Sequence, residues 1–469
     1  MGYQTEINKL KATLASLEQK RDGLKKKIAQ YRSLLSPIHR LLPEVLQHIL
    51  HYAMPKPVNW FEPSSIPSTL SLASAIDFNK WGKQKFHALN HLVRLFFDRT
   101  GVSAFTLILD FGNKKLHNGW LPCLETLVRH SNRWRSLELR ISRSVLEHSA
   151  SIPIKGRLPI LSHLDISGPL GESDPQFRCD LFTACPVLSS IELCPPSPFT
   201  DAACPLPWGQ IRNLTLWGCS GIDGLSVLNL LQNVDSLTLQ NFGASNEIYG
   251  GEHINSDVKR LVIHAECNAE VHCILTNATF PSLSSLDIRG DSRQPNDWTK
   301  WEEKPLVDFL IRSPCTITTL SLKYIPISDQ QTIWLLQHLP MTLCLEEYFS
   351  TDDSSTANHI ITHVFLDKLT VDHARASPSF LPKLTRIRLA LHYDRLKKLA
   401  LVKAVASRWI TDEVYSLEIG LTSVESIDIV LIDSEDAQVQ NLTEELQWMA
   451  DAGLRVTIAA LKLEEDKDE

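Results

Sequence analysis

The first 35 residues place apolar or aliphatic-stemmed side chains at alternating spacings of three and four. These positions are Ile7, Leu10, Leu14, Leu17, Arg21, Leu24, Ile28, Tyr31 and Leu35. They form the a/d seam of about four heptads of a coiled coil, with one charged interruption at Arg21. The pattern predicts a helix over residues 1–35 that self-associates or binds a partner. The alternative is an amphipathic helix that folds back on its own domain.

A second, shorter helix is predicted in residues 36–55, which read SPIHRLLPEVLQHILHYAMP. Pro43 suits the first turn of a helix because its missing N–H would be unpaired there, and Glu44 favours the positive end of the helix dipole. An apolar stripe follows, too short to be stable without a partner surface: Val45, Leu46, Ile49 and Leu50. Residues 55–74 carry four prolines among serines and are predicted to be a linker or insertion.

From about residue 104 a short motif recurs, with apolar residues at the first, fourth and sixth positions. Its instances are Trp134-Leu137-Leu139, Leu161-Leu164-Ile166, Leu188-Ile191-Leu193, Ile211-Leu214-Leu216, Val234-Leu237-Leu239, Val258-Leu261-Ile263, Leu283-Leu286-Ile288, Ile317-Leu320-Leu322, Leu366-Leu369-Val371, Leu384-Ile387-Leu389 and Val424-Ile427-Ile429. In the first seven, the middle residues are 27, 27, 23, 23, 24 and 25 residues apart, a spacing typical of leucine-rich repeats. The later spacings are 34, 49, 18 and 40.

Four copies of the motif begin with proline: PILSHLDI, PVLSSIEL, PSLSSLDI and PKLTRIRL, at Pro159, Pro186, Pro281 and Pro382. The proline is predicted to end the preceding helix, and the apolar triplet to start a strand. After one strand, Cys219 stands where leucine-rich repeats place an Asn or Cys that satisfies backbone groups of the turn.

Segments with one apolar face separate the strands and are predicted to be helices, at residues 224–233, 304–313 and 329–339. Residues 434–452 predict a further helix and 454–460 a final strand, before an acidic tail at 462–469. One repeat cannot bury its strand and helix alone, so the repeats must stack. We therefore predict an α/β fold, with residues 104–461 forming a curved parallel sheet lined outside by helices.

Charge and cysteine content narrow the class of protein. The formal net charge of −7 gives no reason to expect a nucleic acid or an anionic membrane as partner. A local excess of six positive charges in residues 1–40 is explained by the solvated face of the heptad helix. The ten cysteines form no CxxC pair, which favours a reducing compartment, and no apolar run approaches the roughly 18 residues that span a bilayer. We expect a soluble protein of the cytoplasm, the nucleus or both.

No constellation of catalytic or metal-binding residues rises above background. The best metal candidates are His264, Cys267, His272 and Cys273, and a second polar group comprises Asp352, Asp353, His359 and His363. Neither spacing matches a known site, so both are interpreted as unrelated residues, and we expect no enzyme activity and no cofactor. Tryptophans fall at or beside predicted strands and helices and are expected in the core: Trp134, Trp208, Trp217, Trp334, Trp409 and Trp448.

Residues 36–55 resemble the first helix of an F-box, in the form found in F-box proteins with leucine-rich repeats from mushroom-forming fungi (basidiomycetes). The heptad helix before it and the phrases HLVRLFFDRTGVSAFTLIL (91–109) and LVRHSNRWRSLELRI (127–141) are similar to landmarks of that family. The resemblance implies that the helix docks onto a Skp-type adaptor, and through it a cullin, while the repeats capture a target protein for ubiquitination. The implied adaptor contacts are Pro37, Ile38, Leu41, Pro43, Glu44, Val45, Ile49 and Leu50.

One part of the family's pattern is missing. The second F-box segment, of the form V-C-x-x-W-R, does not occur in the chain, and Trp81 is the single faint echo, so the F-box is shortened and degenerate over about residues 56–98. Two hypotheses follow: a substrate-recognition subunit of a ubiquitin ligase, or a non-catalytic scaffold that has lost adaptor binding. In both, specificity would lie on exposed strand residues and in the loops at 290–304 and 346–362.

Overall fold

The computed structural model describes residues 69–72, 83–112, 118–141, 151–166, 180–194, 205–218, 225–241, 253–290, 301–337, 342–347, 360–373, 380–393 and 396–462. The predicted coiled coil, the predicted F-box helix and residues 463–469 of the acidic tail lie outside these ranges. The chain divides into two compact units. The first reaches Arg135 and takes in Arg140–Pro153, and the second comprises Ser136–Leu139 and the chain from Ile154 onward.

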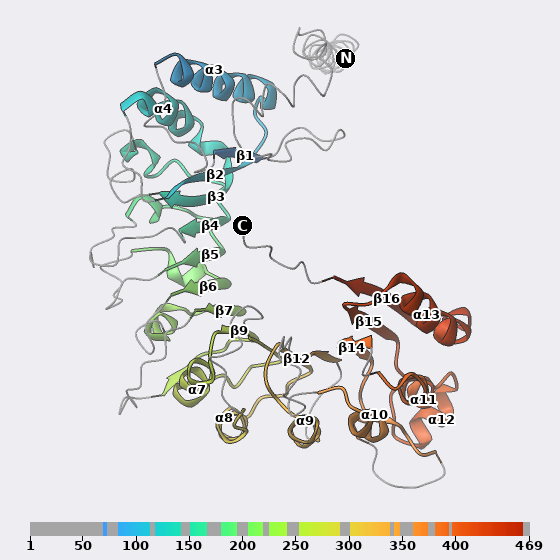
Figure 1. The fold of residues 1–469 in the computed structure, drawn as a ribbon. Coiled ribbons are helices and arrows are strands. Elements are labelled where there is room, and N and C mark those ends of the chain that lie inside the picture. Colours follow the sequence, from blue (N-terminus) through green and yellow to red (C-terminus); the bar gives the residue numbers. More distant parts are fainter. Residues whose placement is uncertain are drawn as a thin grey trace, which may run out of the picture. The chain divides into compact units, whose positions relative to one another are not determined.

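Among its described residues, the first unit has the helices α3 and α4 and the paired strands β1 and β2 (Figure 1). Strand β1 (Thr69–Leu72) runs parallel to β2 (Phe105–Gly112), with Leu70 beside Leu107. Leu70 and Leu72 are buried, whereas the sequence predicted a linker here. The strand forms because these leucines alternate with polar residues and find a parallel neighbour. The unit also extends beyond residue 104, where the repeat domain was predicted to begin.

Helix α3 (Lys83–Thr100) packs against α4 (Leu121–Arg129), which follows the short 3-10 turn η3 (Asn118–Trp120). The buried apolar face of α3 consists of Phe86, Leu89, Val93 and Phe97. After the 3-10 turn η4 (Ser131–Arg133), the guanidinium of Arg133 donates to Ser103 O at 3.0 Å and to Thr100 Oγ1 at 2.6 Å. These bonds join the end of the α4 segment to the turn between α3 and β2.

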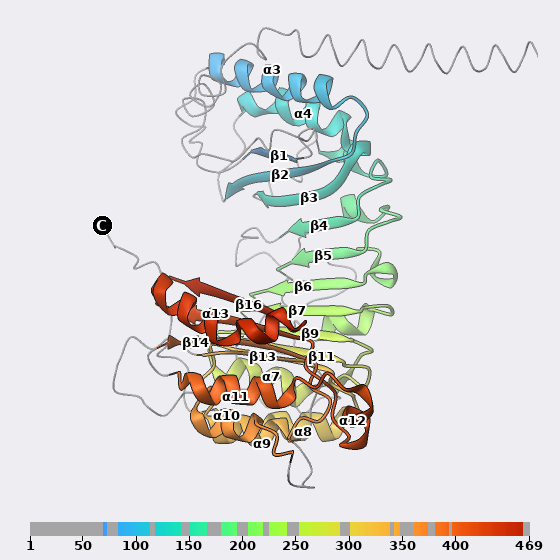
Figure 2. The ribbon, with the colours of Figure 1, turned by 90° about the vertical axis from the view of Figure 1, so that its right-hand side faces the viewer.

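The second unit is built on one parallel sheet, in which successive repeats place their strands side by side in the order β3-β4-β5-β6-β7-β9-β11-β12-β13-β14-β15-β16 (Figures 1 and 2). β3 (Trp134–Ile141) contributes residues 136–139 to this unit. The remaining strands are β4 (His163–Ile166), β5 (Ser190–Leu193), β6 (Asn213–Trp217), β7 (Ser236–Gln240), β9 (Arg260–Ala265), β11 (Ser285–Gly290), β12 (Thr319–Lys323), β13 (Thr342–Glu346), β14 (Arg386–His392), β15 (Ser426–Ile432) and β16 (Arg455–Leu461). A separate parallel pair joins β8 (Ile254–Asn255) to β10 (Ala278–Thr279).

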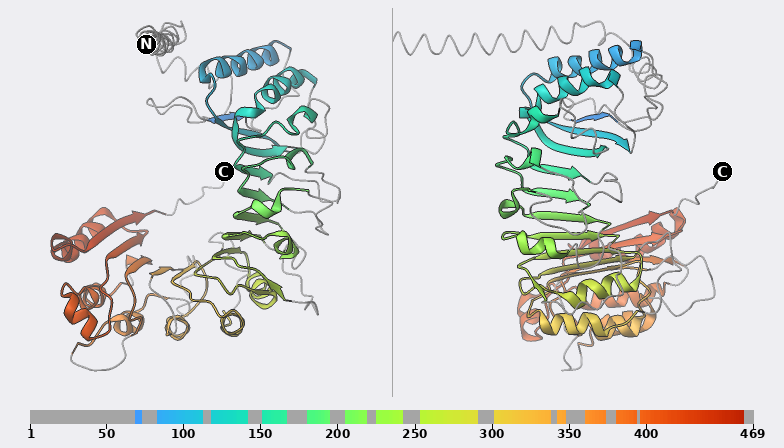
Figure 3. Two further views of the ribbon diagram at one scale, coloured as in Figure 1. Left: turned by 180° about the vertical axis from the view of Figure 1, so that it is seen from behind. Right: turned by 90° about the vertical axis from the view of Figure 1, so that its left-hand side faces the viewer.

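Two kinds of connection link these strands. The first strands are followed by the 3-10 turns η5 (Ile152–Ile154), η6 (Asp180–Phe182), η7 (Trp208–Gln210) and η8 (Ser226–Leu230). Later strands are followed by α7 (Asn268–Asn277), α8 (Lys304–Arg312), α9 (Asp329–Leu336), α10 (His363–Leu369), α11 (Lys398–Arg408), α12 (Glu413–Glu418) and α13 (Asp436–Asp451). Within this unit, α7 to α11 lie along one side of the sheet (Figure 3).

The repeat motif sets the register of the sheet. The middle apolar residues Leu137, Leu164, Ile191, Leu214, Leu237, Leu261, Leu286 and Leu320 stand beside one another on consecutive strands, and all are buried. Their aligned, buried side chains form the core between the sheet and its connections. The prediction of an α/β fold with a parallel sheet and helices is confirmed, as are the helices over 304–313, 329–339 and 434–452 and the final strand.

Some predicted elements were wrong. Leu366 and Leu369 lie in helix α10, and the strand of that repeat is β13, centred on Leu343 and Leu345. Residues 224–233 contain the 3-10 turn η8, where an α-helix was predicted. The repeat prolines occupy the second position of β-turns, so they do not end a helix directly: the N–H groups of Leu188, Leu283 and Leu384 donate to the carbonyl of the residue before each proline.

Candidate functional site

The side of the sheet that faces away from the buried leucines carries the polar residues of each strand. Strand residues alternate between the two faces, so the residues flanking each buried leucine share the opposite face. Because the leucines are in register, these flanking residues are in register too. The result is an aligned surface across the second unit that is mostly polar, with apolar exceptions such as Val262, Ala390 and Val430.

At one end of this surface, three carboxylates stand in line on neighbouring strands. Glu138 is paired with Asp165, and Asp165 with Glu192. The indole N–H of Trp217 donates to Glu192 Oε1. The paired positions of β3 to β7 within the described residues hold no lysine or arginine. We call the three carboxylates the acidic row.

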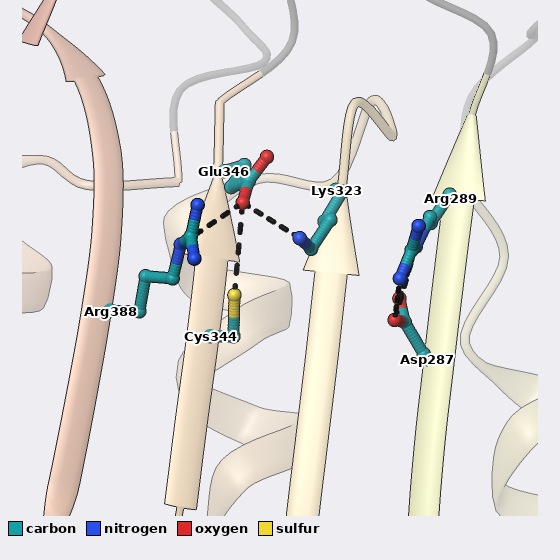
Figure 4. Close-up of polar contacts among 6 residues, drawn as sticks. All are labelled: Asp287, Arg289, Lys323, Cys344, Glu346 and Arg388. Atoms are coloured by element: carbon teal, nitrogen blue, oxygen red, sulfur yellow. Dashed lines mark hydrogen bonds and ion pairs between the residues drawn. The ribbon is translucent and has the colours of Figure 1, made fainter. Parts of the chain in front are cut away.

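Farther along the same face, β11 to β14 carry a cluster of opposite charges (Figure 4). Arg289 Nη2 lies 2.6 Å from Asp287 Oδ2 on the same strand. Glu346 Oε1 lies 2.8 Å from Lys323 Nζ and 3.5 Å from Arg388 Nε, so one carboxylate bridges cations from the strands on both sides. Cys344 also directs its S–H toward Glu346 Oε1, at 3.9 Å.

The carboxylates of this cluster are recessed and the guanidinium groups are not. The side chain of Glu346 is 6% exposed and that of Asp287 15%, whereas Arg289 is 38% exposed and Arg388 51%. A ligand approaching the sheet therefore meets positive charge first. His264, beside Arg289 on the neighbouring strand, adds no full charge near neutral pH because burial and the adjacent Arg289 lower its pKa.

Tyr324, directly after Lys323, shows that this region is under local strain. Its φ of 54° lies in the left-handed region that a bulky side chain rarely adopts. Burial and the neighbouring Glu346 carboxylate raise the pKa of its hydroxyl. Comparable positions after other strands hold Gly218, Asn241 and Asp433, which tolerate this conformation better. Strain of this kind concentrates at sites that bind or switch.

No group of three His, Cys, Asp or Glu side chains is arranged to hold a metal ion in the residues that the structure describes. Of the first candidate group, His264 lies in β9, Cys267 precedes α7, and His272 and Cys273 lie in α7. Burial raises the pKa of the Cys273 thiol. Of the second group, His363 begins α10 and the other three residues lie outside the described ranges.

The tryptophans divide between core and surface. Trp134 and Trp208 are buried as predicted. Trp334 and Trp448 are 44% and 52% exposed, so the prediction that they lie in the core was wrong. Both belong to helices, α9 and α13, that bury only one face. The ring of Trp448 packs edge-on against Trp409.

The adaptor contacts implied by the resemblance all lie outside the described residues. They are Pro37, Ile38, Leu41, Pro43, Glu44, Val45, Ile49 and Leu50. The two loops expected to hold specificity are described only at their ends, including Glu346 and Glu347. Sequence reasoning missed the cluster on β11 to β14, although the residues flanking the apolar positions of each repeat could have indicated it.

None of the helices in the described part of the chain is both long and apolar enough to cross a membrane. No protein-family model matches the chain, and no curated protein matches its sequence significantly.

Proposed function

We propose that the chain is the substrate-recognition subunit of a Skp–cullin–RING ubiquitin ligase, acting in the cytoplasm, the nucleus or both. In this proposal the segment 36–55 docks onto the adaptor, and the polar face of the parallel sheet captures the protein to be ubiquitinated. The chain itself performs no chemistry and needs no cofactor. Leucine-rich-like repeats suit this role because each adds one strand to a surface whose exposed positions vary freely.

The observation that carries the capture part is the register of the sheet. Aligned leucines on one face fix the positions of the polar residues on the other, which gives a rigid surface of defined charge. The adaptor part rests on the stretch Leu42-Pro43-Glu44 and the short apolar stripe after it, a helix that needs a partner groove.

The packing of helix α3 in the first unit supports a second candidate function. This helix begins within the region where the rest of an F-box is expected, yet it buries Phe86, Leu89, Val93 and Phe97 in the first unit. Residues used in this core are not free to complete an adaptor-binding domain. The alternative is therefore a scaffold that binds partners through its sheet and self-associates through residues 1–35.

Co-expression with a Skp-type adaptor from a mushroom-forming fungus tests the proposal. We expect the two proteins to co-purify, and the double variant Pro43→Ala, Ile49→Ala to abolish the complex. The matched control, Pro57→Ala with Ile66→Ala, changes the predicted linker and should leave the complex intact. Failure of the wild-type proteins to co-purify, or an intact complex with the first variant, would contradict the proposal.

Self-association is tested separately by light scattering. If residues 1–35 form a coiled coil between two chains, their deletion should halve a dimeric mass. A mass that stays dimeric after the deletion would contradict this part of the scaffold hypothesis.

A further inference from the structure

The charges on the polar face of the second unit are segregated along the sheet. At the paired positions of β9 to β14, all within the described residues, five side chains are cationic and two are carboxylates. The cations are Arg260, Arg289, Lys323, Arg386 and Arg388, and the carboxylates are Asp287 and Glu346. We call this surface the cationic face, whereas β3 to β5 carry the acidic row.

On the cationic face, the arginines are more exposed to solvent than the two carboxylates. Arg260, Arg386 and Arg388 are exposed, and Arg289 is partly exposed. Both carboxylates are largely buried and bind the charged ends of neighbouring cations: Asp287 accepts from Nε and Nη2 of Arg289, and Glu346 lies beside Lys323 Nζ and Arg388 Nε (Figure 4). Those ion pairs engage Nε and Nη2 of Arg289 and the ammonium of Lys323, so a partner meets chiefly the exposed Arg260, Arg386 and Arg388.

We propose that the cationic face binds an acidic segment of the captured protein, with the exposed Arg386 and Arg388 as its principal contacts. This inference rests on the proposed function only in taking the polar face of the sheet as the capture surface. Guanidinium groups pair with carboxylates through two parallel hydrogen bonds, so exposed arginines held by a rigid sheet favour Asp or Glu side chains.

The acidic row makes a nucleic acid a poorer ligand for this face. A phosphate backbone that extended past β9 would meet the partly exposed Glu138 and Glu192 on the same sheet, with Asp165 buried between them, and the chain as a whole carries a formal net charge of −7. A protein segment with acidic residues over β9 to β14 and neutral or basic residues over β3 to β5 meets no such repulsion.

Fluorescence anisotropy with the full-length protein tests the inference. The probes are a labelled peptide of alternating glutamate and serine, a matched peptide with glutamine for glutamate, and a labelled oligothymidine. We expect the glutamate peptide to bind at least about tenfold more tightly than the glutamine peptide, with an affinity that falls as salt is added. Equal binding of the two peptides, or tighter binding of oligothymidine, would overturn the proposal.

Two variants with opposite expected effects localise the binding. Arg388→Glu reverses an exposed charge and should weaken the glutamate peptide about tenfold, whereas Asp287→Asn removes a carboxylate beside Arg289 and should tighten it about threefold. Arg455→Glu is the matched control, because Arg455 is an exposed cation on β16, outside the cationic face. Circular dichroism of each variant checks that it is folded. Unchanged affinity in folded Arg388→Glu and Asp287→Asn would also overturn the proposal.

The outcomes separate this inference from the ligase proposal. If the adaptor co-purifies but the glutamate peptide does not bind, the ligase proposal stands and the acidic partner is wrong. If the peptide binds as expected but the adaptor does not co-purify, the cationic face stands and the ligase proposal is wrong.

Discussion

Two connections of equal length in the second unit fold differently. From Leu214 to Leu237 and from Leu320 to Leu343 the chain advances 23 residues, yet the first connection forms the 3-10 turn η8 and the second the helix α9. Length therefore does not decide the type of connection. One difference lies at the start of each segment, where one sequence supplies a side-chain cap and the other does not, although α7, α8 and α11 form without such a cap.

Ser328 begins α9 with a capping box. Its Oγ accepts the N–H of Gln331 at 3.3 Å, and its own N–H donates to Gln331 Oε1 at 3.0 Å. Leu225, before η8, makes no side-chain capping bond. Capped ends satisfy N–H groups that the helix leaves unpaired, so α9 has support that η8 lacks.

The two kinds of connection also bind the preceding repeat through different groups. In the 3-10 part, neutral amides bind the preceding repeat: Gln210 Nε2 donates to Cys185 O at 2.6 Å, and Asn233 Nδ2 donates to Gly209 O at 2.6 Å. In the helical part, arginines at the last position of a helix do so, namely Arg312 of α8 and Arg408 of α11. A buried guanidinium binds more carbonyls and is more costly to remove.

The largest predicted effect is at Arg408, which is 2% exposed. Its guanidinium donates to Leu369 O at 2.5 Å, to Leu381 O at 2.9 Å and to Phe380 O, and burial lowers its pKa to about 10. Arg408→Met removes the donors to these three carbonyls, of which Leu381 O keeps the N–H of Leu384, and should lower the free energy of unfolding by about 3 kcal/mol. Urea unfolding measures this loss.

Two further variants isolate the cause. Arg408→Lys keeps one cationic donor and should recover part of the lost stability. Arg455→Met removes an exposed arginine from β16 and should change the free energy of unfolding by less than about 0.5 kcal/mol. Equal losses in Arg408→Met and Arg455→Met would show that the bonds from Arg408 to the carbonyls do not stabilise the fold.

Ten of the eleven apolar triplets correspond to strands in the structure. β13 was missed because Pro340 occupies the place of its first apolar residue, which breaks the pattern. Leu366, Leu369 and Val371 matched the pattern but begin in a helix, since a spacing of three also fits one helix face. Thr362, whose Oγ1 accepts the N–H of Phe365 at 3.3 Å, starts that helix.

The candidate site was harder to predict, for a related reason. With β13 misplaced, Glu346 could not be positioned between Lys323 and Arg388, and the cluster depends on that register. The recessed position of its carboxylates depends on packing depth, which a single sequence does not reveal. The residues that the sequence did suggest, Pro37 to Leu50, came from a resemblance and stay a prediction.

A second prediction concerns Glu270, in the first turn of α7, which accepts the N–H of Glu266 at 2.9 Å. Burial raises the pKa of Glu270 from 4.5 to about 7. The folded chain therefore holds this proton more tightly than the unfolded chain. Its contribution to the free energy of unfolding is greatest below pH 4.5 and falls as the pH rises from 4.5 to about 7.

Glu270→Gln keeps the acceptor and removes the titration. Relative to wild type, the variant should gain about 2 kcal/mol between the ends of that pH range, read from urea unfolding at several pH values. Glu413→Gln, an exposed carboxylate in the first turn of α12, is the control and should show no such gain. A pH-independent difference for Glu270→Gln would contradict the raised pKa.

The capping difference between the two equal connections gives a smaller effect. Ser328→Ala removes the acceptor for the Gln331 N–H and should lower the free energy of unfolding by about 1 kcal/mol. Ser226→Ala, at the start of the uncapped η8, should have a smaller effect because the turn lacks a capping box. Hydrogen exchange of the α9 amides localises the loss, and equal losses in both variants would mean that capping does not distinguish the connections.

The smallest effect is expected for the side-chain amide bond of Asn233 in the 3-10 connections. Asn233 is exposed and its Nδ2 makes one bond, to Gly209 O at 2.6 Å. Asn233→Ala should therefore lower the free energy of unfolding by only about 0.5 kcal/mol, since water can replace the lost donor. Urea unfolding of Asn233→Ala and Arg408→Met under the same conditions compares the two losses in the free energy of unfolding. A loss for Asn233→Ala as large as that for Arg408→Met would show that the 3-10 and helical connections depend equally on their bonds to the preceding repeat. Burial of the bonded carbonyls would then not explain the expected difference in stability.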